Sequence, residues 1–325
     1  MDMKGSIAAI KDAITKSTAE RTSPEVISAA YAVVYLIGGV LLASARLLGA
    51  AGPFGMAAVA ASGAGLNGVA ALIGAAIGYI ISCGLAGSIR YLAAIVLVYT
   101  ISFAFQDTKF ASKSVFAPAT AAVSALSTGI LSSFTSVFTQ APAAAVVLIE
   151  TVFSFGGCWF FREAMSGRER TTESEELRYA GSVLITAAVL LMAVSQIEIF
   201  GAISLGRLVA VLIVMTCTLR CGIMTGCTIG TAFGIAMDLT AGGMPFYTMA
   251  YAFAGLLSGM FNRHGRLLFL LSFIIANAAA VACAWAFRQE TGALFEVFAA
   301  SVIFLLLPSG FLSRAGSMVQ PVIGG

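Results

Sequence analysis

Charged residues are scarce in this sequence, and that scarcity decides its class. Only 10% of the 325 residues are charged, tryptophan occurs twice and histidine once, whereas soluble domains carry about a quarter charged residues. Hydrophobic residues make up 59% of the chain and its mean hydropathy is +0.98. A soluble fold is therefore excluded, and we expect a polytopic membrane protein. The formal net charge of +3 comes without a lysine or arginine run, so no nucleic acid partner is expected.

The N-terminal residues 1–25 lack the continuous apolar segment of a cleaved signal peptide. Isoleucines recur there at helical spacing beside lysines, which fits an amphipathic helix on a membrane surface and equally fits an unstructured segment. The next domain, residues 26–308, is predicted to be the membrane domain. Residues 309–325 turn small and amphipathic and are predicted to begin a cytoplasmic C-terminal region that is cut short.

Long runs without charge locate the membrane helices. The stretch from Leu47 to Ile89 has no charged side chain, and as one helix it would be about 65 Å long, twice the bilayer core of roughly 30 Å. It must therefore fold back, and glycines with Asn67 mark the turn. The short hairpin at 53–65 and 68–83 is expected to cross or to re-enter. The expected helices are 26–45, 53–65, 68–83, 88–106, 115–138, 142–161, 179–197, 204–219, 221–238, 245–260, 267–287 and 293–307. The fold class is thus an all-α bundle of ten to twelve spans.

The positive charges predict the orientation of these spans. With the N-terminus inside, 14 of the 18 lysines and arginines fall on the cytoplasmic side. The four outside are Arg46, Arg90, Arg207 and Arg288. The loop from Arg162 to Arg178 is cytoplasmic, and removing one hairpin takes away two crossings without moving either end. Both termini are therefore expected in the cytoplasm.

Glycines at intervals of four form the clearest local pattern. They line one helix face and continue in the next span, which allows a neighbouring backbone to approach closely. The predicted helix-packing residues are Gly222, Gly226, Gly230, Gly234, Gly255 and Gly259. A gating surface and a broken substrate-binding helix are the alternatives.

Two carboxylates at membrane depth are the other candidates. Glu150 lies well inside the 142–161 span and Glu296 just inside the last one. Each needs a partner or a watery cavity, and Arg90 and Arg207 are possible partners that the sequence alone does not pair. A structural ion pair, a protonated hydrogen-bonded glutamate and a proton or cation relay remain open. Asp238, which ends a span before a glycine-proline turn, is expected to be solvated.

Residues for catalysis or metal binding are lacking. Six cysteines lie in apolar stretches, and the cluster of Cys217, Cys221 and Cys227 has no nearby histidine or acidic ligand, so neither a disulfide framework nor a zinc site is expected. His264 lies in a basic turn and is expected to be solvated. No phosphate loop or nucleophile elbow occurs. We therefore expect this chain not to be an enzyme and to bind no cofactor.

Taken in order, these features resemble the N-terminal membrane domain of the stage II sporulation protein E family, membrane-bound serine phosphatases of endospore-forming bacteria. The resemblance covers about 26–310. It is carried by the segments 38–47 and 53–55, by Glu150, by the glycine repeat with Gly226-Cys227-Thr228-Ile229-Gly230, by 254–259, and by Phe295-Glu296 leading to 304–308.

The resemblance implies about ten spans followed by a cytoplasmic regulatory region and a phosphatase domain that uses manganese or magnesium, whose metal ligands lie outside this chain. That phosphatase activates a forespore sigma factor. The membrane part would localise the enzyme to the asymmetric division septum, contact septum proteins and membrane lipid, and self-associate. An alternative is a secondary transporter or small-molecule sensor that uses Glu150. Inverted repeats would support it, but no similarity between the halves is evident in the sequence.

Overall fold

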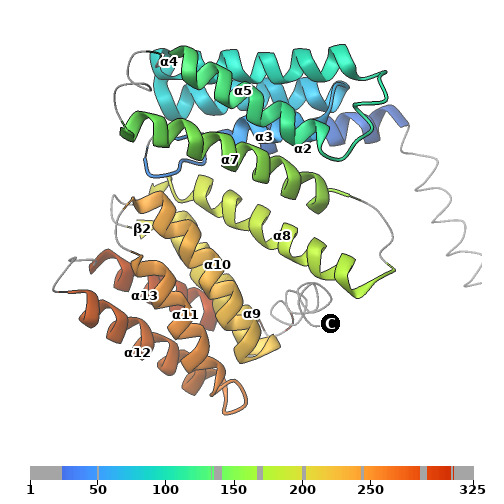
Figure 1. The fold of residues 1–325 in the computed structure, drawn as a ribbon. Helices are drawn as coiled ribbons and strands as arrows, with labels where there is room; N and C mark the ends of the chain where they lie inside the picture. Colours follow the sequence, from blue (N-terminus) through green and yellow to red (C-terminus); the bar gives the residue numbers. More distant parts are fainter. Residues whose placement is uncertain are drawn as a thin grey trace, which may run out of the picture.

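The computed structural model describes residues 24–49, 51–132, 134, 141–166, 171–199, 203–242, 245–285, 291–308 and 310. Over these residues the chain forms eleven helices and one pair of two-residue strands (Figure 1). The all-α prediction is confirmed. The predicted segments 1–25 and 309–325 lie outside the described residues, apart from residues 24, 25 and 310.

The element bounds follow the predicted spans closely. The first half of the chain forms α2 (Pro24–Ser44), α3 (Phe54–Ser62), α4 (Leu66–Phe105), α5 (Phe116–Ser132) and α7 (Ala141–Ala164). The second half forms α8 (Glu173–Val194), β1 (Glu198–Ile199), β2 (Ile203–Ser204), α9 (Leu205–Cys221), α10 (Ile223–Ala241), α11 (Phe246–Gly259), α12 (Arg266–Ala284) and α13 (Thr291–Leu306). The sequence did not predict the two strands, which pair antiparallel between α8 and α9.

Helix α4 is a hairpin of two arms rather than one rod. Gly84 has φ 68° and ψ 169° inside it, a backbone conformation open to glycine and costly for other residues. Beyond this turn the second arm, 85–105, runs back along the first arm, 66–83. The rings of Tyr79 and Tyr91 stack with centroids 4.7 Å apart, and the Tyr99 hydroxyl donates to the Ala64 carbonyl at 3.1 Å. The predicted break between 83 and 88 thus needs only one glycine.

Helix α3 lies at the centre of the first half of the molecule, and its residues from Phe54 to Ala60 are all buried. The chain reaches it through the non-helical residues 45–49 and 51–53, among which Leu47 and Ala51 form an antiparallel bridge. Both ends of this segment are inside the protein, since Ala45, Leu47 and Ala51 are each at most 3% exposed, whereas Leu48 is 51% exposed. Irregular backbone at membrane depth is tolerated only in such surroundings.

The second half repeats the architecture of the first in the same direction. We call α2–α7 the N-terminal unit and α8–α13 the C-terminal unit. Each begins with a long helix, continues through a short antiparallel backbone pairing into a central helix, and then adds a helical hairpin and two further helices. The central helix α3 contacts α2, α4, α5 and α7, and α9 contacts α8, α10, α11, α12 and α13. The hairpin of α10 and α11 therefore corresponds to the two arms of α4.

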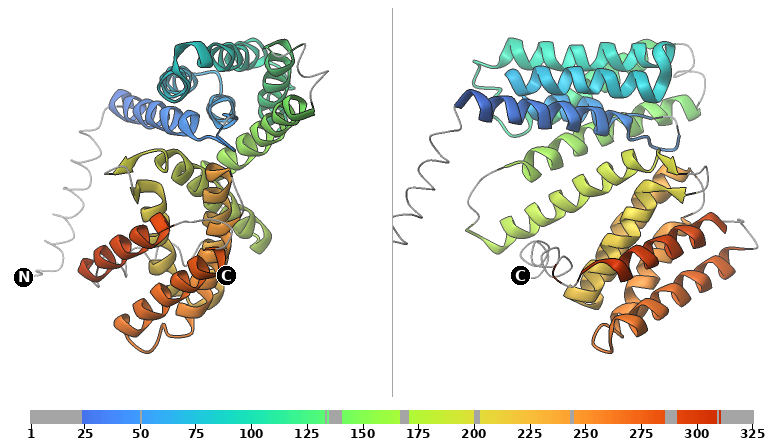
Figure 2. Two further views of the ribbon diagram at one scale, coloured as in Figure 1. Left: turned by 90° about the vertical axis from the view of Figure 1, so that its left-hand side faces the viewer. Right: turned by 180° about the vertical axis from the view of Figure 1, so that it is seen from behind.

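The chain interval between equivalent residues supports this repeat. Leu47 pairs with Ala51 before α3, and Ile199 pairs with Ile203 before α9. The number of residues from Leu47 to Ile199 equals the number from Ala51 to Ile203. The repeat is parallel rather than inverted, because consecutive elements alternate in direction and each unit begins at the same end of the bundle (Figure 2, right).

Five helices are long and apolar enough to cross a membrane: α4, α7, α8, α10 and α12. Shorter apolar helices cover Ser28–Ser44, Phe116–Ser132 and Gly292–Leu306. These helices are those of a membrane protein, as the composition predicted.

Candidate functional site: two buried carboxylates

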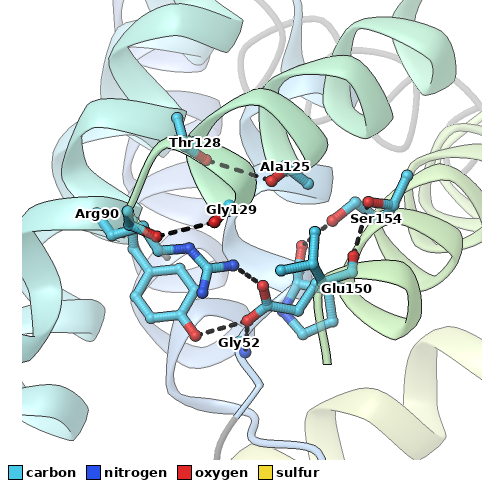
Figure 3. A network of polar contacts seen from close by, with 12 residues as sticks. Gly52, Arg90, Ala125, Thr128, Gly129, Glu150 and Ser154 are labelled. Atoms are coloured by element: carbon cyan, nitrogen blue, oxygen red, sulfur yellow. Dashed lines mark hydrogen bonds and ion pairs between the residues drawn. The ribbon is translucent and has the colours of Figure 1, made fainter. Parts of the chain in front are cut away.

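The carboxylate of Glu150 on α7 is completely buried and lies at the centre of the N-terminal unit. It forms an ion pair with the Arg90 guanidinium from the second arm of α4. Its Oε1 accepts from the Tyr91 hydroxyl at 2.7 Å and from the Gly52 backbone N–H at 3.3 Å. Figure 3 shows Arg90, Glu150 and Gly52 converging from three segments that are far apart in the sequence. The charge is thus both paired and hydrogen-bonded, as a buried charge requires.

Two tyrosines complete this network. The Tyr79 hydroxyl donates to the Gly52 carbonyl at 2.5 Å and accepts from the Met56 N–H at 3.2 Å. Ser154, one turn beyond Glu150, donates to the Pro53 carbonyl at 3.2 Å. The contacts of Tyr79 and Ser154 all end on the backbone between Gly52 and Met56, as does one bond of Glu150. The network therefore holds the entry into α3, where a helix start leaves N–H groups without helical partners.

A glycine on α5 leaves room for the arginine. A Cβ at Gly129 would lie 2.8 Å from Val147 Cγ1 and 3.5 Å from the Arg90 Nη2. The position thus brings α5 close to α7 beside the ion pair, and Figure 3 places Gly129 next to Arg90.

Glu296 on α13 occupies the equivalent place in the C-terminal unit. It is 1% exposed, its Oε1 lies 3.5 Å from Arg207 Nη1, and it accepts from the Ser204 backbone N–H at 3.1 Å. The Arg207 guanidinium lies over the Tyr247 ring, 4.7 Å from its centroid. Each unit therefore has a glutamate on its last helix, paired with an arginine and bonded to the backbone N–H just before the central helix. Gly52 and Ser204 are separated by the same interval as Leu47 and Ile199.

The structure pairs the arginines that the sequence left unassigned: Arg90 with Glu150, and Arg207 with Glu296. The tyrosines were missed, because no local pattern marks a tyrosine whose partner lies far along the chain. The arginines differ in origin, since Arg90 lies in the second arm of α4 and Arg207 lies on the central helix α9. The two sites share a role and differ in detail.

The prediction that Asp238 is solvated is wrong. Asp238 is 8% exposed, and its carboxylate accepts from the backbone N–H groups of Tyr247 and Thr248 at 2.8 Å each and from the Thr248 hydroxyl at 2.6 Å. It thus satisfies donors at the N-terminus of α11, where a negative charge is favourable. Because α11 folds back over Asp238, this residue is buried although it lies near the end of α10.

Most of the predicted packing glycines lie at close helix contacts within the chain. A Cβ at Gly230 would lie 2.5 Å from the Tyr251 carbonyl oxygen, one at Gly255 2.6 Å from the Gly226 carbonyl oxygen, and one at Gly259 2.8 Å from Ile223 Cα. Gly234 faces the Thr248 backbone and Gly226 faces the Thr218 side chain at still shorter range. This face joins α10 to α11 and α9, so it is used inside one copy of the chain.

Gly222 stands apart from this face. Its φ is +90° and an added Cβ would meet only Asn262 Nδ2, at 3.7 Å. It ends α9 and begins α10, so its role is the left-handed turn between them.

Within the described residues, no group of three or more histidine, cysteine, aspartate or glutamate side chains is placed to hold a metal ion. The six cysteines are free thiols. His264 is exposed and meets the Phe261 ring edge to face, with centroids 6.0 Å apart.

A cavity of about 440 Å³ lies between the units. Its walls come from α7, α8 and α10 with Phe54, and they are almost entirely apolar. A second cavity of about 330 Å³ lies between α2, α3, α7 and α8. Neither is lined by Glu150 or Glu296.

No family model, no curated protein and no solved structure matches this chain.

Proposed function

We propose that this chain is a non-catalytic membrane domain that anchors a cytoplasmic enzyme and brings copies of it together, as the resemblance to the stage II sporulation protein E family implies. The enzyme would be a serine phosphatase that uses manganese or magnesium and activates a forespore sigma factor. The domain would localise it to the division septum through septum proteins and membrane lipid.

One observation carries this proposal. The first residue of α2 and the last residue of α13 lie at the same end of the bundle (Figure 2, right). Arg162 and Arg178 flank the α7–α8 connection at that end, where Arg178 pairs with Glu163 at 3.1 Å. An excess of lysine and arginine, counted without regard to acidic residues, marks the cytoplasmic side. A domain attached after α13 would therefore meet the cytoplasm.

We infer ten complete crossings. Nine residues of α3 span about 13.5 Å at 1.5 Å per residue, too short for a core of roughly 30 Å. Helix α3 and the first arm of α4 then form a hairpin that enters and leaves at the extracytoplasmic end. The remaining helices and the second arm of α4 cross, which leaves both termini in the cytoplasm.

The two buried carboxylates fit an anchoring role. Each forms an ion pair with an arginine and accepts a hydrogen bond from a backbone N–H just before the central helix. A relay needs a carboxylate that can release its proton to a water-filled path, and among the described residues neither glutamate lines either of the two cavities reported above.

Topology and self-association test the proposal together. A fluorescent protein fused after Gly325 should be fluorescent in cells, whereas alkaline phosphatase fused there should be inactive. Two copies with different affinity tags, expressed together, should co-purify from mild detergent. An active alkaline phosphatase fusion, or tagged copies that never co-purify, would overturn the anchor function. A reading frame that continues beyond Gly325 into a phosphatase domain would identify the anchored enzyme.

A secondary transporter or small-molecule sensor is the second candidate, and the parallel repeat favours it because many transporters are built from two such units. Uptake of a radiolabelled solute or an ion flux in proteoliposomes, abolished by Glu150→Gln, would support this candidate over the anchor.

A further inference from the structure

The repeat leaves one face of the chain without the neighbour that its counterpart has. Helix α7 ends the N-terminal unit and packs against α8, which begins the next unit. Helix α13 is the counterpart of α7, and α2 is the counterpart of α8. No contact of more than marginal extent joins α13 to α2 among the described residues. The contact between α7 and α8, which we call the seam, therefore forms once within the chain. In the part of the chain that the structure describes, the equivalent faces of α13 and α2 have no such partner.

Equivalent positions differ in exposure as this idea requires. On α8, Val189 lines the seam cavity and is 4% exposed; its counterpart on α2, Ile37, is 51% exposed. On α7, Phe160 lines the same cavity and is half-buried. The counterpart of Phe160 on α13, found by the same chain interval that separates Glu150 from Glu296, is Leu306, which is 78% exposed. By the same interval, the counterpart of Gly156 is Val302, which is also exposed.

The two open sides are placed so that one partner can reach both. Helices α2 and α13 lie on the same side of the molecule (Figure 2, left). They run in opposite directions, as α8 and α7 do (Figure 2, right). Their exposed side chains Val33, Ile37, Phe298, Val302 and Leu306 are all apolar, so such a seam would lie in the hydrocarbon region of the bilayer.

We propose that these faces bind a second copy of this chain, with α13 of each copy packed against α2 of the other. The contact reproduces the α7–α8 seam between copies. Formed twice about a two-fold axis along the membrane normal, it closes a dimer of four units and leaves no open side. This inference deepens the self-association in the proposed function and rests on it. It also assigns that self-association to α2 and α13 instead of the glycine face of α10, which is already used inside the chain.

Site-directed cross-linking tests the pairing. In a background with the six native cysteines replaced by alanine, one tagged copy carries Ile37→Cys and a second, differently tagged copy carries Val302→Cys. After oxidation in native membranes, we expect a cross-linked heterodimer that contains both tags. Val33→Cys with Leu306→Cys is a second pair across the same seam, because Ile185 and Phe160 line the α7–α8 cavity together. Ile89→Cys with Val302→Cys is the control, since Ile89 is 64% exposed on α4 and away from the seam.

Each outcome has a distinct meaning. Cross-linking of both seam pairs without the Ile89 control supports the proposal. Homodimers of the Ile37→Cys copy alone, or equal cross-linking of the control, would overturn it. Loss of all cross-links while tagged copies still co-purify would also overturn it and would leave the proposed function standing. A chain that neither cross-links nor co-purifies would defeat both, and lipid or another protein would then cover these helices. Each variant should elute from a sizing column as the parent does.

Discussion

The two units of this molecule share a buried carboxylate but not their close-packed glycines. In the N-terminal unit, glycines bring α2 against the first arm of α4: a Cβ at Gly39 would lie 2.6 Å from the Ala71 carbonyl oxygen. In the C-terminal unit they bring α10 against α11. In both units, by contrast, a glutamate on the last helix bonds the backbone before the central helix. We call this bond from the glutamate to the backbone, together with its arginine, the polar clamp. The polar clamp is common to both units, whereas the glycine contacts differ between them.

The largest effect should come from breaking the clamp. Glu150→Ala leaves Arg90 unpaired and the Gly52 N–H without its acceptor, and loss of one partner of a buried pair costs about 3–5 kcal/mol. We expect a strongly lowered melting temperature in detergent, measured by the loss of the monodisperse peak after heating. Glu150→Gln combined with Arg90→Met should recover part of the loss, because no unpaired charge remains and the amide still accepts from Gly52.

The same change in the other unit sharpens the comparison. Arg207 and Arg90 are similarly exposed, at 24% and 19%, but the Arg207–Glu296 ion pair, at 3.5 Å, is the longer of the two and is therefore the weaker attraction. Glu296→Gln should therefore lower the melting temperature less than Glu150→Gln does. Equal effects would show that the units depend on their clamps to the same extent.

The glycine contacts give a matched pair of neighbouring residues. Gly39→Ala places a methyl group against the backbone of α4 and should cost about 1–3 kcal/mol as overpacking. Gly38→Ala meets nothing within 4 Å and should be neutral or stabilising by up to about 1 kcal/mol, since alanine favours the helix. Thermal unfolding of both variants checks this, and equal destabilisation would refute the assigned contact.

The hairpin turns differ between the units in how they are held. Arg46 donates to the Ser82 carbonyl at 2.8 Å at the end of the first arm of α4, whereas Asp238 accepts from the first N–H groups of α11. Loss of a capping carboxylate costs about 0.5–2 kcal/mol. Asp238→Ala should therefore destabilise by about that amount and Asp238→Asn by less, as measured by thermal unfolding. A neutral Asp238→Ala variant would mean that water replaces the carboxylate there.

Hydropathy and charge predicted the helices well because each span is a local property of the chain. The break between 83 and 88 and the glycine face of α10 were likewise visible in the sequence. The short helix at 53–65 was predicted too, but the irregular segment before it was not, because the glutamate that bonds this segment comes from α7, far along the chain. Asp238 was misplaced for a similar reason: a carboxylate at the end of a span is buried only when a later helix folds over it. The repeat escaped detection because it rests on backbone pairing and helix contacts, which many apolar side chains can satisfy.

The last comparison is between two buried tyrosines, one in each unit. The Tyr79 hydroxyl both donates to Gly52 and accepts from Met56, whereas the Tyr251 hydroxyl is buried and has no hydrogen-bond partner among the described residues. Tyr79→Phe removes a bond and leaves a buried carbonyl and N–H unsatisfied, at a cost of about 1–3 kcal/mol. Tyr251→Phe removes a hydroxyl whose burial is unfavourable and is not offset by a hydrogen bond. The melting temperature of this variant should therefore be unchanged or raised. A clear destabilisation by Tyr251→Phe would show that a buried water bonds this hydroxyl, and the C-terminal unit would then have a polar network as extensive as that around Glu150.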